Sequence, residues 1–214
     1  MAQIVYVYGK SGAGKSRSLK NFAEDEILLI KCMDKELPFR SKFKYTGKTV
    51  NVDAILGQLK KMSELNIKTA VIDDAGYIMT NIFMEKHGKG DQYAVFNLIA
   101  DSMWKLINGI KALPADIVVY LIFHEEKTEI GETKLLTIGK LLDGKVCLEG
   151  MVSVVIHCVA EEKKHYFITQ GDGMGITKSP EEMFKEAKME NDLKAVDKSV
   201  REYYGISLEK KEEN

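Results

Sequence analysis

A glycine-rich stretch near the amino terminus, GKSGAGKS at residues 9–16, constrains this chain more than any other feature. It matches the phosphate-binding pattern G-x-x-x-x-G-K-[ST] at every required position. The apolar run before it, residues 3–8, predicts a buried strand, and residues 15–23 predict a helix after it. In this setting glycines let successive backbone N–H groups turn toward phosphates, and the helix adds its positive amino-terminal end. A glycine-rich turn that matches by chance is the alternative.

The same pattern predicts which groups hold a nucleotide and its metal. We expect the Lys15 ammonium to reach the β- and γ-phosphates and to be catalytic, and the Ser16 hydroxyl to be a ligand of Mg²⁺. The residues predicted to contact the nucleotide are Gly9, Lys10, Ser11, Gly12, Ala13, Gly14, Lys15, Ser16 and Arg17.

Two acidic residues end a short apolar run, residues 68–73, which predicts a second buried strand. A nucleotide site needs a carboxylate that holds the water shell of the metal, and we assign this role to Asp73. Asp74 is the candidate catalytic base that orients the attacking water. Asp is also common as a helix N-cap or turn residue, so a structural role for Asp74 is the alternative.

The most strand-like run of the chain, residues 116–124, ends in a histidine. If this strand lies between the strands that carry the glycine-rich loop and Asp73, His124 sits beside the γ-phosphate. It is then a candidate sensor of hydrolysis and the third predicted catalytic residue. The alternative is a histidine at a strand end that contacts only solvent.

The rest of the chain alternates strand and helix patterns, which predicts an α/β domain with a largely parallel sheet flanked by helices. Residues 27–32 are a predicted strand, and residues 42–51 are a predicted hairpin with its turn at 46–48. Asp53 is the expected N-cap of the next helix, and residues 91–113 have the period of a long helix.

Two strand patterns late in the chain, residues 151–160 and 164–170, predict a β-hairpin. We divide the chain into a P-loop domain, 1–178, and a C-terminal helical extension with a charged, frayed end, 179–214. The extension is predicted to be helical over 181–204, and its apolar stripe is more typical of docking on its own domain than on a partner. The stripe is formed by Leu193, Val196, Val200 and Tyr203.

Composition narrows the classes further. No apolar run approaches the roughly 18 residues of a membrane span, and no export signal precedes the first strand. The three cysteines have neither metal-ligand nor redox spacing, which predicts buried, reduced thiols and a cytoplasmic protein. A net charge of −1 argues against a uniformly basic surface but is compatible with a local basic stripe, so nucleic acid is not excluded as a partner.

Three known classes of P-loop protein each have a sequence feature that this chain lacks or changes. GTPases need an Asn-Lys-x-Asp motif, which this chain lacks. Small-molecule kinases usually carry an arginine-rich lid, whereas the arginines here are Arg17, Arg40 and Arg201. Lys10 matches the signature lysine of the partitioning ATPases, although Ser11 replaces a glycine of their motif. A nucleotide-gated switch that holds a partner protein is therefore kept as the alternative function.

Taken together, the loop, VIDD, the strand that ends in FHEE, the lysine-bearing segment, the late hairpin and ITKSPEEMF resemble the phage-encoded RecA-like P-loop ATPases of the AAA-domain type. The resemblance covers residues 3–184. It implies a RecA-like core with the His124 strand between the other two, and ATP hydrolysis with Mg²⁺. It also implies a role in DNA recombination or replication, with single-stranded DNA, a single-strand binding or annealing protein, or further copies of the chain as partners in the host cytoplasm.

The chain departs from this family in two ways. Full-length recombinases place a catalytic glutamate after their second strand; here Asp34 and Glu36 occupy that neighbourhood, and neither is preferred over Asp74. No arginine finger is evident, so a trans-acting cation is expected to be a lysine or Arg201.

The segment 125–147 takes the place where recombinases carry a mobile DNA-binding loop. It lacks a clean period, which predicts a surface loop or short helix, and its lysines are candidates for contacts to DNA phosphates. An ordinary solvated loop is the alternative, because five acidic residues dilute its charge. The candidate lysines are Lys127, Lys134, Lys140 and Lys145.

Overall fold

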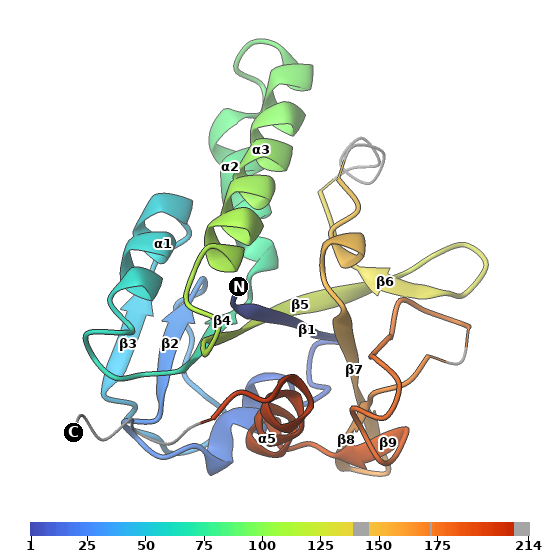
Figure 1. Cartoon of the computed structure of the whole chain (residues 1–214). Coiled ribbons are helices and arrows are strands. Elements are labelled where there is room, and N and C mark those ends of the chain that lie inside the picture. Colours follow the sequence, from blue (N-terminus) through green and yellow to red (C-terminus); the bar gives the residue numbers. More distant parts are fainter. Residues whose placement is uncertain (139–145, 172, 208–214) are drawn as a thin grey trace.

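A single sheet runs through the centre of the molecule (Figure 1). The computed structural model describes residues 1–138, 146–171 and 173–207. Within these ranges the strand order is β3-β2-β4-β5-β1-β7-β8-β9, and β6 pairs with β5 off this path. The first six strands in this order run parallel to one another. They are β3 (Tyr45–Lys48), β2 (Ile27–Lys31), β4 (Thr69–Asp73), β5 (Val118–Lys127), β1 (Gln3–Gly9) and β7 (Val154–Glu161).

The sheet ends in antiparallel strands. β8 (Lys164–Ile168) pairs antiparallel with β7, and β9 (Lys188–Glu190) with β8. β6 (Thr133–Leu135) pairs antiparallel with the end of β5. The predicted fold class, a mostly parallel sheet with a late hairpin, is confirmed. So is the position of β5 between β1 and β4, which the family resemblance implied.

Helices cover both faces of the sheet and bury a separate core on each. Because successive side chains of a strand point to opposite faces, Tyr6 and Tyr8 of β1 enter one core while Val5 and Val7 enter the other. Figure 1 shows α2 and α3 rising as a pair beyond the sheet, and α5 crossing its opposite end. The first core packs against α1 (Val52–Lys60), α2 (Gly76–Lys86) and α3 (Gln92–Lys111); the second packs against the 3₁₀ helix η1 (Ser16–Asn21) and α5 (Leu193–Tyr204).

The long predicted helix is confirmed as α3, and the side chain of Asp91 caps it by accepting a hydrogen bond from Tyr93 N. The predicted cap of α1 is wrong. Asn51 is its N-cap and accepts from Ala54 N at 3.0 Å, whereas Asp53 lies in the first turn. An Asp in the first turn also stabilises a helix, because its negative charge interacts with the positive end of the helix dipole. In the sequence this Asp looks much like an N-cap residue.

The hairpin predicted at 42–51 is wrong, because this segment supplies the single parallel strand β3. Gly47 lies inside the strand, where an added Cβ would be 1.9 Å from Gln58 Oε1 of α1. The glycine therefore permits close packing rather than a turn. The helix predicted over 15–23 is the shorter 3₁₀ helix η1, in which the Ser18 hydroxyl donates to the Lys15 carbonyl at 2.6 Å.

The C-terminal helix begins later than predicted. α5 starts at Leu193, where the Asp192 side chain accepts from Lys194 N, and β9 occupies part of the segment before it. Tyr203 is 46% exposed and does not share the buried face of Leu193 and Val200. The cysteine prediction holds for Cys32 and Cys158, which are buried, and is wrong for the exposed thiol of Cys147.

A buried ion pair fastens α5 to the amino ends of the central strands. Arg201 and Asp197 are 3% and 5% exposed, and Arg201 Nε donates to Asp197 Oδ2 at 2.7 Å. This removes Arg201 from the candidates for a trans-acting cation. The pair is surrounded by further hydrogen bonds, from Arg201 to the Lys68 and Asp116 carbonyls and the Thr69 hydroxyl, and from Tyr120 Oη to Asp197.

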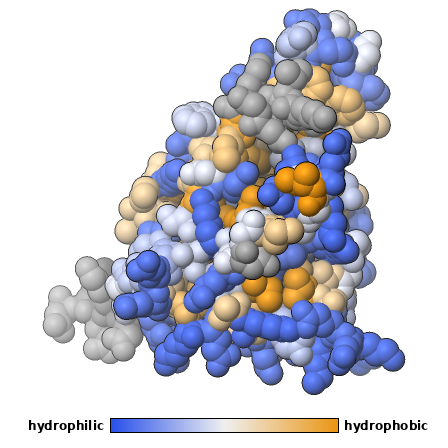
Figure 2. Space-filling view, turned by 90° about the vertical axis from the view of Figure 1, so that its right-hand side faces the viewer, coloured by the Kyte–Doolittle hydropathy of each residue, from blue (hydrophilic) through white to orange (hydrophobic). Residues whose placement is uncertain are grey.

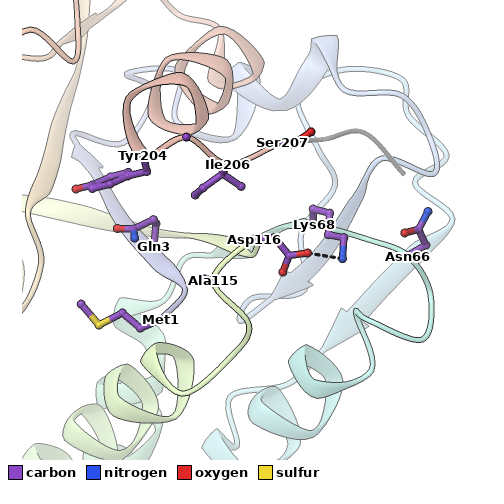
Figure 3. A pocket seen from close by; sticks show the side chains of 10 residues that line it. Met1, Gln3, Asn66, Lys68, Ala115, Asp116, Tyr204, Ile206 and Ser207 are labelled. Atoms are coloured by element: carbon purple, nitrogen blue, oxygen red, sulfur yellow. Dashed lines mark ion pairs between the residues drawn. The ribbon is translucent and has the colours of Figure 1, made fainter. Parts of the chain in front are cut away.

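A cavity of 1110 Å³ opens at this same edge of the sheet (Figure 3). Residues from the end of α5 and from the starts of β1, β4 and β5 line it, and the Lys68–Asp116 ion pair lies on its wall at 2.6 Å. Open α/β sheets bind their ligands at the carboxyl ends of the strands, so this cavity lies at the edge opposite to the expected site.

The face turned toward the viewer in Figure 2 is largely hydrophilic, with apolar residues in small separate patches outside the grey atoms. Among the described residues, no helix combines the length and the apolar character needed to cross a membrane.

Candidate functional site

The glycine-rich loop lies at the carboxyl edge of β1, with Gly9 in register with His124 of β5. Gly12 and Gly14 have φ angles of 80° and 101°, which glycine adopts without steric cost. Gly9 approaches β7 so closely that an added Cβ would be 2.3 Å from the Cys158 carbonyl oxygen. The loop therefore needs glycine at each of these positions.

The Lys15 side chain lies inside the loop. Its residue is 6% exposed, and Nζ donates to the carbonyls of Gly9 and Lys10, at 2.7 Å each. Burial lowers the pKa of Lys15, and the negative charges of Asp74 and Asp73 oppose this effect. A phosphate group placed in the loop would offer Nζ a stronger, charged partner than these carbonyls.

Ser16 and Asp73 face each other at the start of η1 and the end of β4. Ser16 Oγ is 3.0 Å from both carboxylate oxygens of Asp73, which is 3% exposed. Burial raises the pKa of Asp73, and so does the nearby charge of Asp74. Hydroxyl and carboxylate oxygens suit Mg²⁺, so the two residues fit the metal that P-loop sites use. No group of three or more His, Cys, Asp or Glu side chains that could hold a metal exists in the described ranges; the phosphates would complete the shell.

Asp74 and His124 lie next to Lys15, because β5 is inserted between β1 and β4. His124 Nδ1 is 3.5 Å from Lys15 Nζ, and His124 Nε2 is 3.4 Å from Asp74 Oδ1. Asp74 is 2% exposed with φ 59°, a left-handed conformation that Asp tolerates. The structure thus brings the three predicted catalytic residues together. The N-cap of α2 is Ala75, so Asp74 does not hold that position, but Asp74 does lie in the turn before the helix, as the structural alternative predicted.

The Asp74 carboxylate differs at its two oxygens. Among the described residues, Oδ1 is buried and has no hydrogen-bond partner of normal geometry. Oδ2 forms an ion pair with Lys35 Nζ. Burial acts to raise the pKa of Asp74, but the contacts with His124 and Lys35 outweigh it and lower the pKa. A charged carboxylate oxygen without a partner is suited to accept a hydrogen bond from a ligand.

Sequence reasoning missed Lys35, although it inspected the neighbouring acidic residues after the second strand. Asp34 instead forms an exposed ion pair with Lys48 of β3, so it is turned to a different partner. The only sequence signal for Lys35 was its position just after the second strand. In this sheet the carboxyl ends of β2 and β4 are adjacent, so that position lies close to Asp74.

A second layer of contacts holds the loop from behind. The Ala13 carbonyl accepts from Cys158 Sγ at 3.2 Å and lies 2.8 Å from His165 Nδ1. Asn191 Nδ2 donates to Cys158 Sγ at 3.3 Å, and Arg17 Nη1 donates to Asn191 Oδ1 at the same distance. Arg17, predicted to contact the nucleotide, is thus engaged with Asn191. No local motif marks His165 or Asn191.

We expect His165→Ala to weaken nucleotide binding about fivefold, because the Ala13 carbonyl loses a hydrogen bond of about 1 kcal/mol. A titration with a fluorescent ATP analogue measures this. His87→Ala is the matched control, since that histidine is exposed at the end of α2. Equal affinities for the two variants would contradict a positioning role for His165.

The lysine-bearing segment is partly a two-stranded ribbon, so the predicted loop or short helix is wrong for residues 125–127 and 133–135, whereas residues 128–132 between these strands form a loop. β5 runs on to Lys127 and pairs with β6, whose Leu135 is buried against the core. Lys134 Nζ pairs with Glu126 at 2.8 Å. Lys140 and Lys145 lie outside the described residues.

A pocket of about 330 Å³ separates this ribbon from the loop. Its wall includes Glu125, whose Oε2 is 2.6 Å from His157 Nε2, and the Tyr8 ring stacks on His157 with centroids 4.5 Å apart. The pocket joins residues 10–13 to the ends of β5 and β7. The loop and the ribbon therefore line the same pocket.

One comparison with known proteins gives a match. A family model described as an AAA domain matches residues 1–188. No curated protein matches the chain. The matched range includes every residue of the site described above except Asn191.

Proposed function

The chain belongs to this AAA domain family of P-loop ATPases, and from that premise we propose that it is a Mg²⁺-dependent ATPase that acts on DNA in recombination or replication. The observation that carries the proposal is the buried Asp74 Oδ1, which among the described residues has no hydrogen-bond partner of normal geometry and lies 3.4 Å from His124 Nε2, beside Lys15. Asp74 supplies an acceptor for water at the place where the loop would present the γ-phosphate.

The proposed reaction is hydrolysis of the bond between the β- and γ-phosphates. A water oxygen attacks the γ-phosphorus, ADP leaves with the bridging oxygen, and Asp74 orients the water by accepting a hydrogen bond from it. Lys15 exchanges the Gly9 and Lys10 carbonyls for phosphate oxygens. Mg²⁺, held by Ser16 and Asp73, supplies charge neutralisation when bound. Catalysis by these groups is mostly positioning and electrostatics.

His124 is proposed to report the state of the nucleotide to the ribbon. It contacts both Lys15 and Asp74 and is followed directly in β5 by the residues that pair with β6. Lys127 and Lys134 of the ribbon, with Lys140 and Lys145, are the proposed contacts to DNA phosphates, and such contacts are salt-sensitive and independent of sequence. A RecA-like mechanism, a single-strand binding or annealing protein as partner, homo-oligomer formation and a place in the cytoplasm stay predictions.

The test is ATP hydrolysis by the purified chain with and without single-stranded DNA, at low and moderate salt. Stimulation that falls as salt rises supports the DNA role. Hydrolysis that DNA does not change contradicts it and favours the nucleotide-gated protein switch, for which the exposed Lys10 would be the signature lysine.

We expect His124→Ala to reduce the ratio of turnover with DNA to turnover without DNA to about 1, because the contact between Lys15 and Asp74 through the imidazole is lost. Steady-state hydrolysis over a range of DNA concentrations measures this ratio. Tyr93→Ala, an exposed change on α3 away from the loop, is the control. A His124→Ala variant with a wild-type ratio would reject the sensor role.

A further inference from the structure

Lys35 reaches the site from the segment after β2, which carries none of the other proposed catalytic groups. It follows β2, and its ammonium forms an ion pair with Asp74 Oδ2. The contacts then continue from Asp74 Oδ1 to His124 Nε2 at 3.4 Å and from His124 Nδ1 to Lys15 Nζ at 3.5 Å. Lys35 therefore stands at the far end of a row of charged and polar groups that starts inside the glycine-rich loop.

The two members of the ion pair differ in their freedom to move. The Asp74 side chain is 2% exposed and is fixed at the end of β4, while the Lys35 side chain is 49% exposed. Lysine carries a compact charge on a flexible four-carbon stem. A ligand that competes for the ammonium can therefore draw Lys35 away while the carboxylate stays in place.

Phosphoryl transfer calls for a cation in addition to the loop lysine and the metal, because negative charge spreads over the γ-phosphate oxygens in the transition state. Arg201 is buried at the opposite edge of the sheet, and Arg17 is engaged with Asn191. In the described part of the chain, Lys35 and His124 are the basic groups that contact the candidate base. Of these two, Lys35 has the mobile charge.

We propose that Lys35 is the chain's own γ-phosphate cation, which pairs with Asp74 before ATP binds and moves to the γ-phosphate afterwards. Before the exchange, Lys35 neutralises the carboxylate and makes it a weaker acceptor for water. After the exchange, the same ammonium stabilises the transferring group, and Asp74 Oδ2 no longer has a paired charge that weakens the carboxylate as an acceptor for water. ADP lacks the γ-phosphate, so it leaves the Lys35–Asp74 pair intact. The role rests on the proposed ATPase function and adds a residue that selects ATP over ADP.

The experiment compares Lys35→Ala and Lys35→Arg with Lys48→Ala. Lys48 is a matched exposed lysine, which lies on the neighbouring strand β3 and pairs with Asp34. Turnover is measured at saturating ATP, and dissociation constants are measured for ADP and for the β,γ-imido analogue of ATP. We expect Lys35→Ala to lower kcat about 100-fold, as the loss of one charged transition-state contact does. Its affinity for the imido analogue should fall about tenfold with ADP affinity unchanged, Lys35→Arg should recover part of kcat, and Lys48→Ala should match wild type.

Two results overturn the proposal. A kcat that rises or stays constant in Lys35→Ala shows that Lys35 only restrains Asp74. An equal loss of affinity for ADP and for the imido analogue in Lys35→Ala shows that Lys35 has only a structural role in the site and no contact with the γ-phosphate. The proposed function fails separately if the wild-type protein does not hydrolyse ATP. In that case the binding measurements still test the role of Lys35, because an unchanged preference of Lys35→Ala for the analogue over ADP rejects a contact with the γ-phosphate.

Discussion

Replacing Lys15 with alanine is expected to lower ATP turnover by about 1000-fold, the loss typical of removing a preorganised charged contact from a transition state. The side chain is enclosed by the loop, 3.5 Å from His124, and no other lysine of the described residues is buried, so none occupies the same place inside the loop. Steady-state phosphate release at saturating ATP measures the loss.

The folded state should survive this change. Nζ contacts the carbonyls of Gly9 and Lys10 and lies 3.5 Å from His124 Nδ1, and water can replace it at these three groups. Far-UV circular dichroism and a thermal melt check the fold, and Lys20→Ala serves as the control because that lysine is exposed at the end of the next helix, η1, and has no role in the site. Undiminished hydrolysis by Lys15→Ala would sink the assignment of the site.

The second large effect concerns stability at the other edge of the sheet. Asp197→Ala is expected to lower the free energy of unfolding by about 3–5 kcal/mol, because it leaves the buried guanidinium of Arg201 without its counter-charge. Tyr120 Oη would also lose its acceptor. Urea unfolding followed by circular dichroism measures the change.

The same helix offers a matched control. Lys198 and Glu202 are also four residues apart on α5, but both are exposed and their charged atoms are 3.8 Å apart. Lys198→Ala should cost less than about 1 kcal/mol. Equal costs for the two changes would show that burial does not govern the Asp197 pair. The double change Asp197→Leu with Arg201→Met should recover much of the stability, since it leaves no unpaired buried charge.

The residues of the site that belong to a local motif or follow an apolar strand pattern could be predicted from the sequence. The loop and Asp73 lie at the ends of strands with a strong apolar pattern, His124 follows the apolar part of β5, and the strand order brings these positions together. The family resemblance supplied that order; alternation of strands and helices alone does not determine it. Gly47 shows where local rules fail, because it was interpreted as a turn residue and instead makes room for Gln58.

The residues that sequence reasoning missed share a different property. His165 lies 152 positions from Ala13, and Asn191 lies 174 positions from Arg17, so no window of the sequence contains both partners. No sequence pattern distinguishes Lys35 from an ordinary surface lysine. It has a buried partner, Asp74, because β2 and β4 are adjacent in the sheet. Contacts of this kind depend on tertiary packing, which short patterns do not encode.

The carboxyl-terminal segment has a consequence for how the protein opens. Asn191 ties it to the back of the loop, and the buried pair at Arg201 ties it to β4 and β5 through Thr69 and Asp116. Elements joined at both ends in this way unfold as one cooperative unit rather than fray in sequence order. The nucleotide site should therefore open in the same equilibrium as α5. A change that destabilises this last helix at any point should lower the population of the conformation that binds ATP.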